Sequence, residues 1–343
     1  MNILSPGKLF QRKSDCVILF SGVFLRRNLT GVPFPSHASR IWLDDIEERV
    51  RFLYRTQLKR RAYRCQALDI NALSHLASHF PGGLFASYFG SFQTGKILIH
   101  KNNAGFFVND QDHFRIFSVA PGMRLEYCHQ RSQRIDDFLE SHFDYAFHKT
   151  WGYLTADLRE CGTGMRAEIR IHLPALAFLY GENALMQLFR DKGFFIEQNT
   201  MGNHEARGHI FQITNHFTLG ITERTIIDSL KSLASGLVRW ERQVRRSLAR
   251  SLDRRRQLEE NVLNGYKRIC EMDDFTQREL FNLFSLWVLA RQQGIFVRSR
   301  GLNITEVKNL VKHIVTRNRT LGKECVKLLN FFGVISGEEL CNV

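Results

Sequence analysis

Arginine, carboxylate and cysteine side chains are the groups of this chain that could do chemistry. Lysine and arginine total 48 against 34 aspartates and glutamates, which gives a formal net charge of +14. Such an excess favours acidic partners, namely nucleotides, nucleic acid, phosphorylated proteins or anionic lipid, and does not choose among them. The seven cysteines are scattered and form no CxxC pair. They indicate reduced thiols in a cytoplasmic protein, and we expect neither a disulfide framework nor a metal site.

The composition is that of an ordinary globular protein. The 343 residues are 44% hydrophobic and 24% charged, which excludes a disordered or collagen-like chain and leaves room for two domains. Charged residues interrupt every apolar run before it reaches the ~20 residues that span a bilayer, so we expect no transmembrane helix. The N-terminus lacks the long apolar segment and the cleavage site of a signal peptide.

The elements that must position the chemical groups are strands mixed with helices, followed by helices alone. Residues 41–63 have the apolar spacing of an amphipathic helix, and residues 166–173 alternate apolar with polar, which predicts a half-buried antiparallel strand. From residue 223 onward the pattern is helical. This segregation indicates an α+β fold. The other expected elements are strands at 96–100, 105–109 and 209–215, and helices at 134–147, 177–192, 274–293, 303–315 and 322–332.

Three stretches together resemble one family. The first is VNDQDHFRI at 108–116, the second runs in pieces from Phe143 to Leu176 and includes GYLT and GTGMRA, and the third is EARGHIFQITN at 205–215. They resemble motifs of the phosphagen (ATP:guanido) kinases. The sequences of the last two stretches, together with Glu241-Arg in the predicted helix that follows, are most similar to the bacterial protein-arginine kinase branch.

The resemblance implies a guanido kinase fold. This is an α+β fold with a small helical N-terminal domain, a larger domain with a bent antiparallel β-sheet flanked by helices, and a helical C-terminal extension. We therefore expect a helical, basic N-terminal region at 1–70, a catalytic-type domain at 71–255 and a helical C-terminal region at 256–343.

The resemblance also implies an activity and partners. The family moves the γ-phosphoryl group of Mg-ATP to a guanidinium nitrogen, here of protein arginine, so ATP and Mg²⁺ are the implied cofactors. The implied partners are a protein substrate or regulatory partner, with an activator protein and a protease-associated chaperone typical of the family. The sequence does not decide whether the chain forms a homodimer.

Such a transfer needs arginines that neutralise the phosphates and carboxylates that grip the guanidinium and take its proton. By resemblance, Arg115, Arg166 and Arg170 are expected to bind nucleotide, and His75 falls in an element near it. For Arg115 and Arg166 the alternative is a structural ion pair with an acidic neighbour such as Asp112 or Glu168, and for His75 it is a packed histidine.

Other family positions are substituted. Aligned without gaps, the N-terminal S-S-R-x-R element falls on residues 20–24, so its arginines become Gly22 and Phe24, and Arg26 or Arg27 could serve only if the register slips. Another phosphate-binding arginine becomes Glu197. The family catalytic positions fall on Gln111, which cannot take a proton, on Gly202, and, for the reactive cysteine, on Asp157. Cys161, four residues later, is expected to be a buried thiol.

We therefore expect a catalytically impaired pseudokinase with a regulatory or binding role, whose scaffold is kept while its chemistry is lost. One alternative is an active protein-arginine kinase with a rearranged site, which uses Arg115, Arg166 and Asp157 with Arg26 or Arg27. Another is a basic protein that binds nucleic acid through the helix near 239–256, although Trp240 lies on the apolar stripe of that helix. The family's C-terminal R-D-x-x-R-A motif does not occur in this sequence.

Overall fold

The computed structural model describes most of the chain, apart from its two ends and several internal gaps. The described ranges are residues 17–67, 97–190, 194–198, 208–271, 275–295 and 304–317, with single positions between 322 and 329. His75, Gly202 and most of the expected helix at 322–332 lie outside the described residues.

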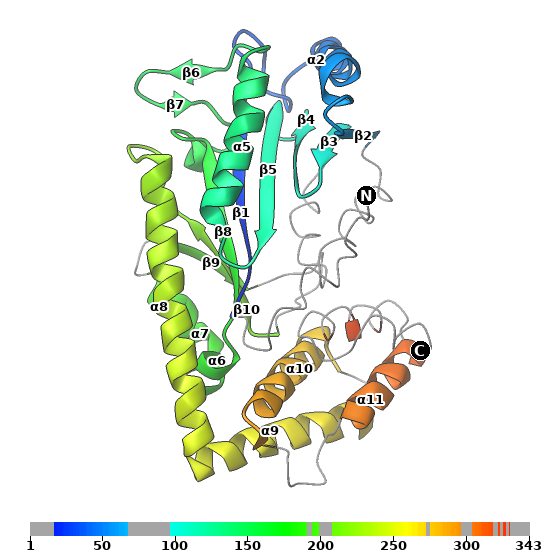
Figure 1. Cartoon of the computed structure of the whole chain (residues 1–343), viewed down its shortest axis with the longest axis vertical. Helices are drawn as coiled ribbons and strands as arrows, with labels where there is room; N and C mark the ends of the chain where they lie inside the picture. The colour runs from blue at the N-terminus through cyan, green and yellow to red at the C-terminus, as the bar shows by residue number, and fades with distance from the viewer. Residues whose placement is uncertain are drawn as a thin grey trace.

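An antiparallel β-sheet forms the centre of the molecule (Figure 1). Its eight strands follow the order β2-β3-β4-β5-β1-β8-β10-β9, and every neighbouring pair is antiparallel. This confirms the predicted fold class. The strands are β1 (Ile18–Arg27), β2 (Arg64–Ala67), β3 (Ile97–Lys101), β4 (Ala104–Val108), β5 (Phe114–Pro121), β8 (Met165–His172), β9 (Phe194–Gln198) and β10 (Ile210–Asn215); β6 (Phe147–His148) and β7 (Gly152–Tyr153) form a separate hairpin.

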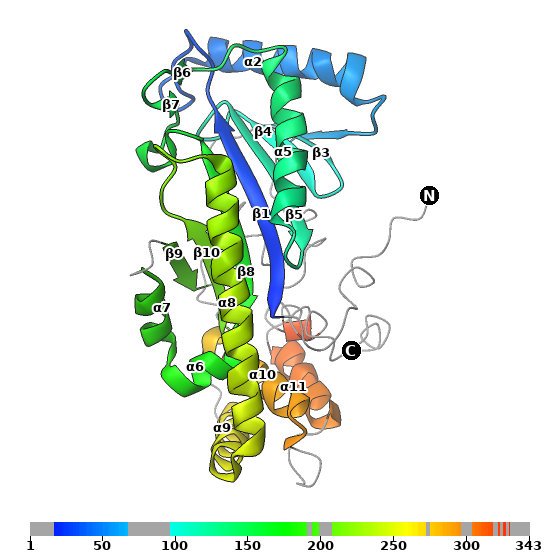
Figure 2. The same ribbon diagram turned by 60° about the vertical axis from the view of Figure 1, so that its left-hand side comes forward.

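Two long helices cover one face of the sheet, as Figures 1 and 2 show from two directions. They are α5 (Leu125–Glu140), which packs on β1 and β5, and α8 (Glu223–Arg250), which packs on β8. Residues of α8 at spacings of three and four are buried, as expected for a helix with one apolar stripe. The opposite face of the sheet is therefore the one that can carry a site.

The remaining helices lie at the two ends of the sheet (Figure 1). At one end, α2 (Arg40–Leu53) continues as a π-helical turn (Tyr54–Leu58). At the other end lie the C-terminal helices α9 (Leu252–Glu271), α10 (Gln277–Gln292) and α11 (Ile304–Arg317), with α9 and α10 packed together. Two short helices from the middle of the chain, α6 (Pro174–Tyr180) and α7 (Glu182–Arg190), pack on α8 and β9 respectively.

The expectation of a helical region at 1–70 is wrong for two segments. β1 lies between β5 and β8 in the middle of the sheet, and β2 pairs with β3 at one edge. Nine of the ten residues of β1 are buried, so both of its faces are covered and the strand lacks the alternation that marks a half-exposed one. The domain limits at 70 and 255 stay predictions.

Two further predictions need correction. The strand at 166–173 is found as β8, but Glu168, Arg170 and His172 are buried too, so the strand is covered on both faces instead of one. The single helix expected at 177–192 is divided into α6 and α7 by Gly181, whose φ of +82° is favourable mainly for glycine.

The expected helix at 134–147 is also displaced. It begins earlier, at Leu125, and ends at Glu140.

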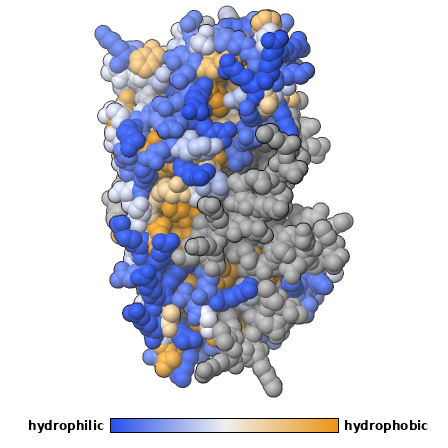
Figure 3. Space-filling view, viewed as in Figure 1, coloured by the Kyte–Doolittle hydropathy of each residue, from blue (hydrophilic) through white to orange (hydrophobic). Residues whose placement is uncertain are grey.

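The described residues on the face drawn in Figure 3 are mostly hydrophilic, with small separate apolar patches. None of the helices in the described ranges is long and apolar enough to cross a membrane.

Candidate functional site

The register of the three central strands brings three arginines together. Arg26 of β1 lies opposite Arg115 of β5, and Phe24 of β1 lies opposite Arg166 of β8. Residues paired across antiparallel strands share a face, as do alternate residues along one strand. Arg26, Arg115 and Arg166, which we term the arginine cluster, therefore lie on one face of the sheet, the face that α5 and α8 do not cover.

The turn between β4 and β5 supplies two carboxylates to the arginine cluster. Arg115 Nη1 donates to Asp110 Oδ2 at 3.1 Å, and Arg26 Nη1 donates to Asp112 Oδ2 at 3.1 Å. Asp112 also accepts from Asn28 Nδ2 at 2.6 Å and from the backbone N–H of Ala156 at 2.7 Å. Asp112 is thus fully buried and joins β1, this turn and the loop after β7.

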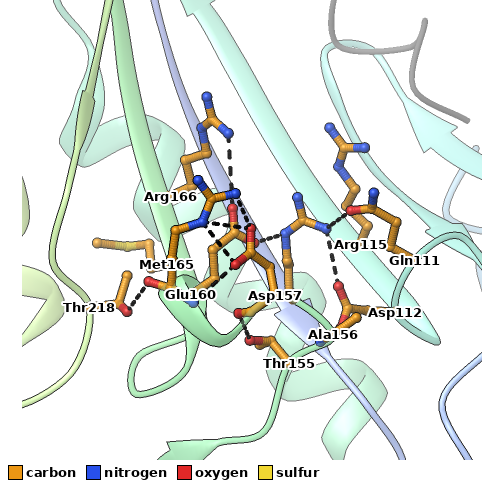
Figure 4. Close-up of polar contacts among 12 residues, drawn as sticks. Gln111, Asp112, Arg115, Thr155, Ala156, Asp157, Glu160, Met165, Arg166 and Thr218 are labelled. Atoms are coloured by element: carbon orange, nitrogen blue, oxygen red, sulfur yellow. Dashed lines mark hydrogen bonds and ion pairs between the residues drawn. The ribbon is translucent and has the colours of Figure 1, made fainter. Parts of the chain in front are cut away.

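A third carboxylate comes from the 3₁₀ turn Leu158–Glu160, which Asp157 caps by accepting from the Arg159 N–H. The carboxylate of Glu160 forms an ion pair with Nε of Arg26, and its other oxygen lies 4.0 Å from Nη1 of Arg166. Figure 4 shows Glu160 beside Arg166, on the opposite side of the site from Arg115 and Gln111. The three guanidinium groups of the cluster thus face three carboxylates, and their formal charges cancel.

Burial makes these charges depend on one another. The side chains of Arg26 and Glu160 are 9% and 11% exposed. Burial alone would lower the pKa of Arg26, but the carboxylates of Glu160 and Asp112 raise it above the ordinary arginine value. Burial and the nearby cation of Arg26 lower the pKa of Arg115, despite its contact with Asp110. Each arginine of the buried pair therefore needs its carboxylate in order to stay charged in the interior.

Asp157 lies at the edge of this cluster and has its own partner. Arg159 grips its carboxylate in a fork, with Nε donating to Oδ1 at 3.0 Å and Nη2 donating to Oδ2 at 2.7 Å. Hydrogen bonds from Arg159 lower the pKa of Asp157, which makes it a weaker base. Cys161 is a buried thiol, as expected, with its Sγ 3.4 Å from the hydroxyl of Thr155.

The positions of the two lost β1 arginines are apolar. A Cβ atom on Gly22 would lie 3.1 Å from the ring of Phe24, so this ring occupies the space beside the glycine. The guanidinium of Arg115 lies over the same ring, with Cζ 5.9 Å from the centroid. An aromatic ring therefore lies where the resemblance would put two cations.

Arg26 contacts the carboxylates of the site from its own place in β1, two residues after Phe24. Alternation along β1 puts Arg26 on the same face as Gly22 and Phe24. Arg27 faces the other way and pairs with Asp136 of α5 at 2.6 Å, so it takes no part in the site. Gln111 accepts a hydrogen bond from Arg26 Nη1 at 3.1 Å.

The remaining predicted residues lie apart from the cluster or outside the described residues. Arg170 is fully buried and donates to Glu168 at 3.1 Å. Glu197 is placed only by its backbone, opposite Gln212 at the β9 edge of the sheet, in line with Arg170 and not with Arg166. The predictions for His75 and Gly202 stay untested.

Sequence reasoning missed Asp110 and Glu160. Asp110 stands beside the predicted Gln111, and Glu160 stands three residues after the predicted Asp157. Neither position is one of the resembled catalytic positions. The contact of Asp110 with Arg115 lies within the turn between β4 and β5. The contact of Glu160 with Arg26 depends on the pairing of β1 with β8, and no local pattern in the sequence gives that pairing.

The residues present do not fit Mg-ATP well. A triphosphate needs guanidinium groups whose positive charge the protein has not already balanced. Here each guanidinium of the cluster faces a carboxylate of the chain. Mg²⁺ needs open carboxylate or phosphate oxygens, and Asp110, Asp112 and Glu160 are all directed at arginines. Within the described ranges, His, Cys, Asp and Glu form no metal-holding group of three or more.

Comparisons with known proteins point to the same fold and family. The family model described as "ATP:guanido phosphotransferase, C-terminal catalytic domain" matches residues 44–244. The protein-arginine kinase of Desulforamulus reducens is 31% identical over 81% of this chain and 79% of its own length. That of Geobacillus sp. is 30% identical over 73% of this chain and 70% of its own length.

Solved structures show the same fold. The duplicated taurocyamine kinase of Schistosoma mansoni, solved with transition state analog components, superposes with a TM-score of 0.54 at 20% identity over 68% of this chain. The match spans 33% of that duplicated chain. A lombricine kinase superposes with a TM-score of 0.52 at 15% identity over 68% of both chains.

Proposed function

The chain belongs to the ATP:guanido phosphotransferase family, in its protein-arginine kinase branch, and we propose that it is a catalytically impaired member with a regulatory or binding role. One observation carries this proposal. Every guanidinium of the arginine cluster faces a carboxylate supplied by the chain itself.

Phosphoryl transfer develops negative charge on the phosphoryl oxygens, and its catalysis is almost entirely positioning plus electrostatic stabilisation of those oxygens. A cluster with no net charge gives little of that stabilisation, and the ring of Phe24 adds none. The base is missing as well, because Gln111 cannot accept a proton and Asp157 is held by Arg159.

The proposed binding role concerns proteins. The relatives are protein-arginine kinases, so arginine-bearing proteins are the partners that a retained scaffold would engage. We place the protein in the cytoplasm, because the cysteines among the described residues are free thiols and free thiols are typical of a reducing compartment.

A phosphoarginine assay tests this proposal. The full-length protein is incubated with γ-labelled Mg-ATP and an arginine-rich protein, beside an active protein-arginine kinase. We expect acid-labile phosphoarginine in the parallel reaction and none above background with this chain. Labelling at a rate comparable to that of the active enzyme would refute the proposal.

The second candidate function is an active kinase with a rearranged site. The position of Arg26 favours it, because this arginine lies directly opposite Arg115 and supplies a cation near the place of the lost ones. This candidate predicts labelling that Arg26→Ala abolishes. Arg40→Ala, which alters an arginine 82% exposed on α2, is the control and should leave the labelling unchanged.

A further inference from the structure

We infer that Glu160 is a built-in ligand of the arginine cluster, and that polyphosphate binds at this site only when the Glu160 carboxylate leaves. The inference rests on the proposed function, because it names the group that keeps the site closed to anions. It concerns a residue to which neither the resemblance nor the comparisons assign a role.

The first support is the place of Glu160 between two strands. Its carboxylate contacts Arg26 of β1 with one oxygen and approaches Arg166 of β8 with the other. Figure 4 shows Glu160 directed toward Arg166 from the loop that carries Asp157. A carboxylate that faces two guanidinium groups from separate strands occupies the place that an oxyanion would take.

The second support is the difference between Glu160 and the other two carboxylates. Asp112 is fixed by two further hydrogen bonds, from Asn28 and Ala156. Asp110 pairs with Arg115 from the tight turn before β5. Glu160 alone of the three stands on a short turn at the surface, where its neighbours Leu158 and Arg159 have side chains mostly exposed to solvent. The backbone of this turn is held by Thr218, whose hydroxyl contacts the carbonyls of Arg159 and Cys161. The Glu160 carboxylate would therefore leave by rotation of its own side chain toward the solvent that surrounds Leu158 and Arg159.

The third support is the charge that its departure would leave. With Glu160 in place, three guanidinium groups face three carboxylates; without it, the cluster carries one uncompensated positive charge in a largely buried site. An unpaired buried cation is costly. A diphosphate or triphosphate could satisfy it with charge-assisted hydrogen bonds, because arginine presents a planar fork of donors to phosphate oxygens.

Calorimetric titration with inorganic pyrophosphate, free of Mg²⁺, tests the inference. We compare the full-length wild type with the isosteric variant Glu160→Gln. An internal ligand lowers the apparent affinity by the fraction of molecules that are open, so we expect Glu160→Gln to bind pyrophosphate at least about tenfold more tightly than the wild type. Equal affinity in the two proteins would overturn the inference.

Asp44→Asn is the control. It also removes one negative charge, but from an exposed carboxylate of α2 that pairs with Arg40, away from the cluster. We expect its affinity for pyrophosphate to equal that of the wild type. A gain as large as that of Glu160→Gln would show that any lost negative charge suffices, and would also overturn the inference.

A double variant locates the gain and guards against unfolding. Glu160→Gln combined with Arg166→Ala should lose the added affinity, and retention of it would contradict binding at this cluster. Thermal unfolding in the absence of ligand shows whether each variant is folded, and Glu160→Ala replaces Glu160→Gln if the latter is not. Phosphoarginine formation by the wild type would refute the proposed function. The comparison of pyrophosphate affinities tests the role of Glu160 separately.

Discussion

Arg26 and Arg27 are neighbours in β1 whose side chains point to opposite faces of the sheet and have different roles. Arg26 faces the site and its carboxylates. Arg27 is 1% exposed and is held against α5 by Asp136, with its guanidinium 3.6 Å from the ring centroid of Tyr153. Arg27 thus joins the strand to the helix that covers it.

We predict that Asp136→Ala destabilises the protein by about 3–5 kcal/mol, because the buried guanidinium of Arg27 loses its hydrogen-bonded carboxylate and keeps Glu223 at 4.0 Å. Urea denaturation at neutral pH measures the change. Asp228→Ala is the matched control, since Asp228 also pairs with an arginine from a helix but is about half exposed. Its effect should stay within about 1 kcal/mol. Similar losses for both variants would contradict the role given to Arg27.

The motifs in the sequence identified some side chains of the site and not their partners. Arg115, Arg166 and Gln111 do lie around one point, and Arg26 and Glu160 complete it. Motif spacing specifies residues that are close along the chain. The contact of Arg26 with Glu160 joins residues far apart in sequence, so it depends on the strand order, which a single sequence does not reveal.

Among the elements, those with a strong local pattern were predicted best. The expected strands at 96–100, 105–109 and 209–215 correspond to β3, β4 and β10, and the expected helices at 274–293 and 303–315 to α10 and α11. β1 was missed because a strand buried on both faces carries no alternation. β8 was found because its apolar and polar residues alternate, but its polar residues Glu168, Arg170 and His172 are buried as well, which alternation does not reveal.

A buried hydrogen-bonded group connects the sheet to the C-terminal helices. The hydroxyl of Ser285 in α10 lies 2.7 Å from His172 Nε2 at the end of β8 and 2.8 Å from His209 Nδ1 just before β10. His209 also lies near Glu182 of α7. Burial lowers the pKa of His209 to about 4 and that of His172 well below its ordinary value. Both imidazoles are therefore neutral in the folded protein at neutral pH.

We predict a pH dependence of stability from this group. In the unfolded chain a histidine has a pKa near 6.5, whereas His209 in the folded protein binds a proton only near pH 4. Between these two pH values the unfolded state is protonated and the folded state is not. The free energy of unfolding is therefore highest above pH 6.5 and falls, by about 3 kcal/mol for His209, as the pH decreases from about 6.5 to about 4. Urea denaturation at pH 7, 6 and 5 measures the loss. His209→Gln should flatten the slope, and an unchanged slope in this variant would assign it to other groups.

The net charge of +14 on the molecule would favour binding to nucleic acid. Residues 237–268, in α8 and α9, contain ten lysines and arginines against four acidic residues. That region contains two aromatic residues, Trp240 and Tyr266, and Tyr266 is partly buried against the core. Trp240 contacts the ring of Tyr180 and lines an apolar cavity of about 1070 Å³ between α7, β9 and α8. It is thus engaged with apolar neighbours and is not set among the basic side chains as a base-stacking platform.

We predict that fluorescence anisotropy with single-stranded RNA and DNA gives no saturable binding at moderate salt. Weak binding at low salt that disappears as salt is added would reflect the general positive charge. Saturable binding that persists at moderate salt, and that weakens when arginines of α8 and α9 are replaced, would instead support the nucleic-acid function.

The arginines of the site are held by the chain's own carboxylates, and calorimetric titration of Mg-ATP into the full-length wild-type protein tests whether they can still bind nucleotide. We expect no saturable binding at millimolar nucleotide, because Arg26, Arg115 and Arg166 each face a carboxylate of the chain. Binding with a micromolar dissociation constant that Arg115→Ala abolishes would show that these arginines remain available to phosphate.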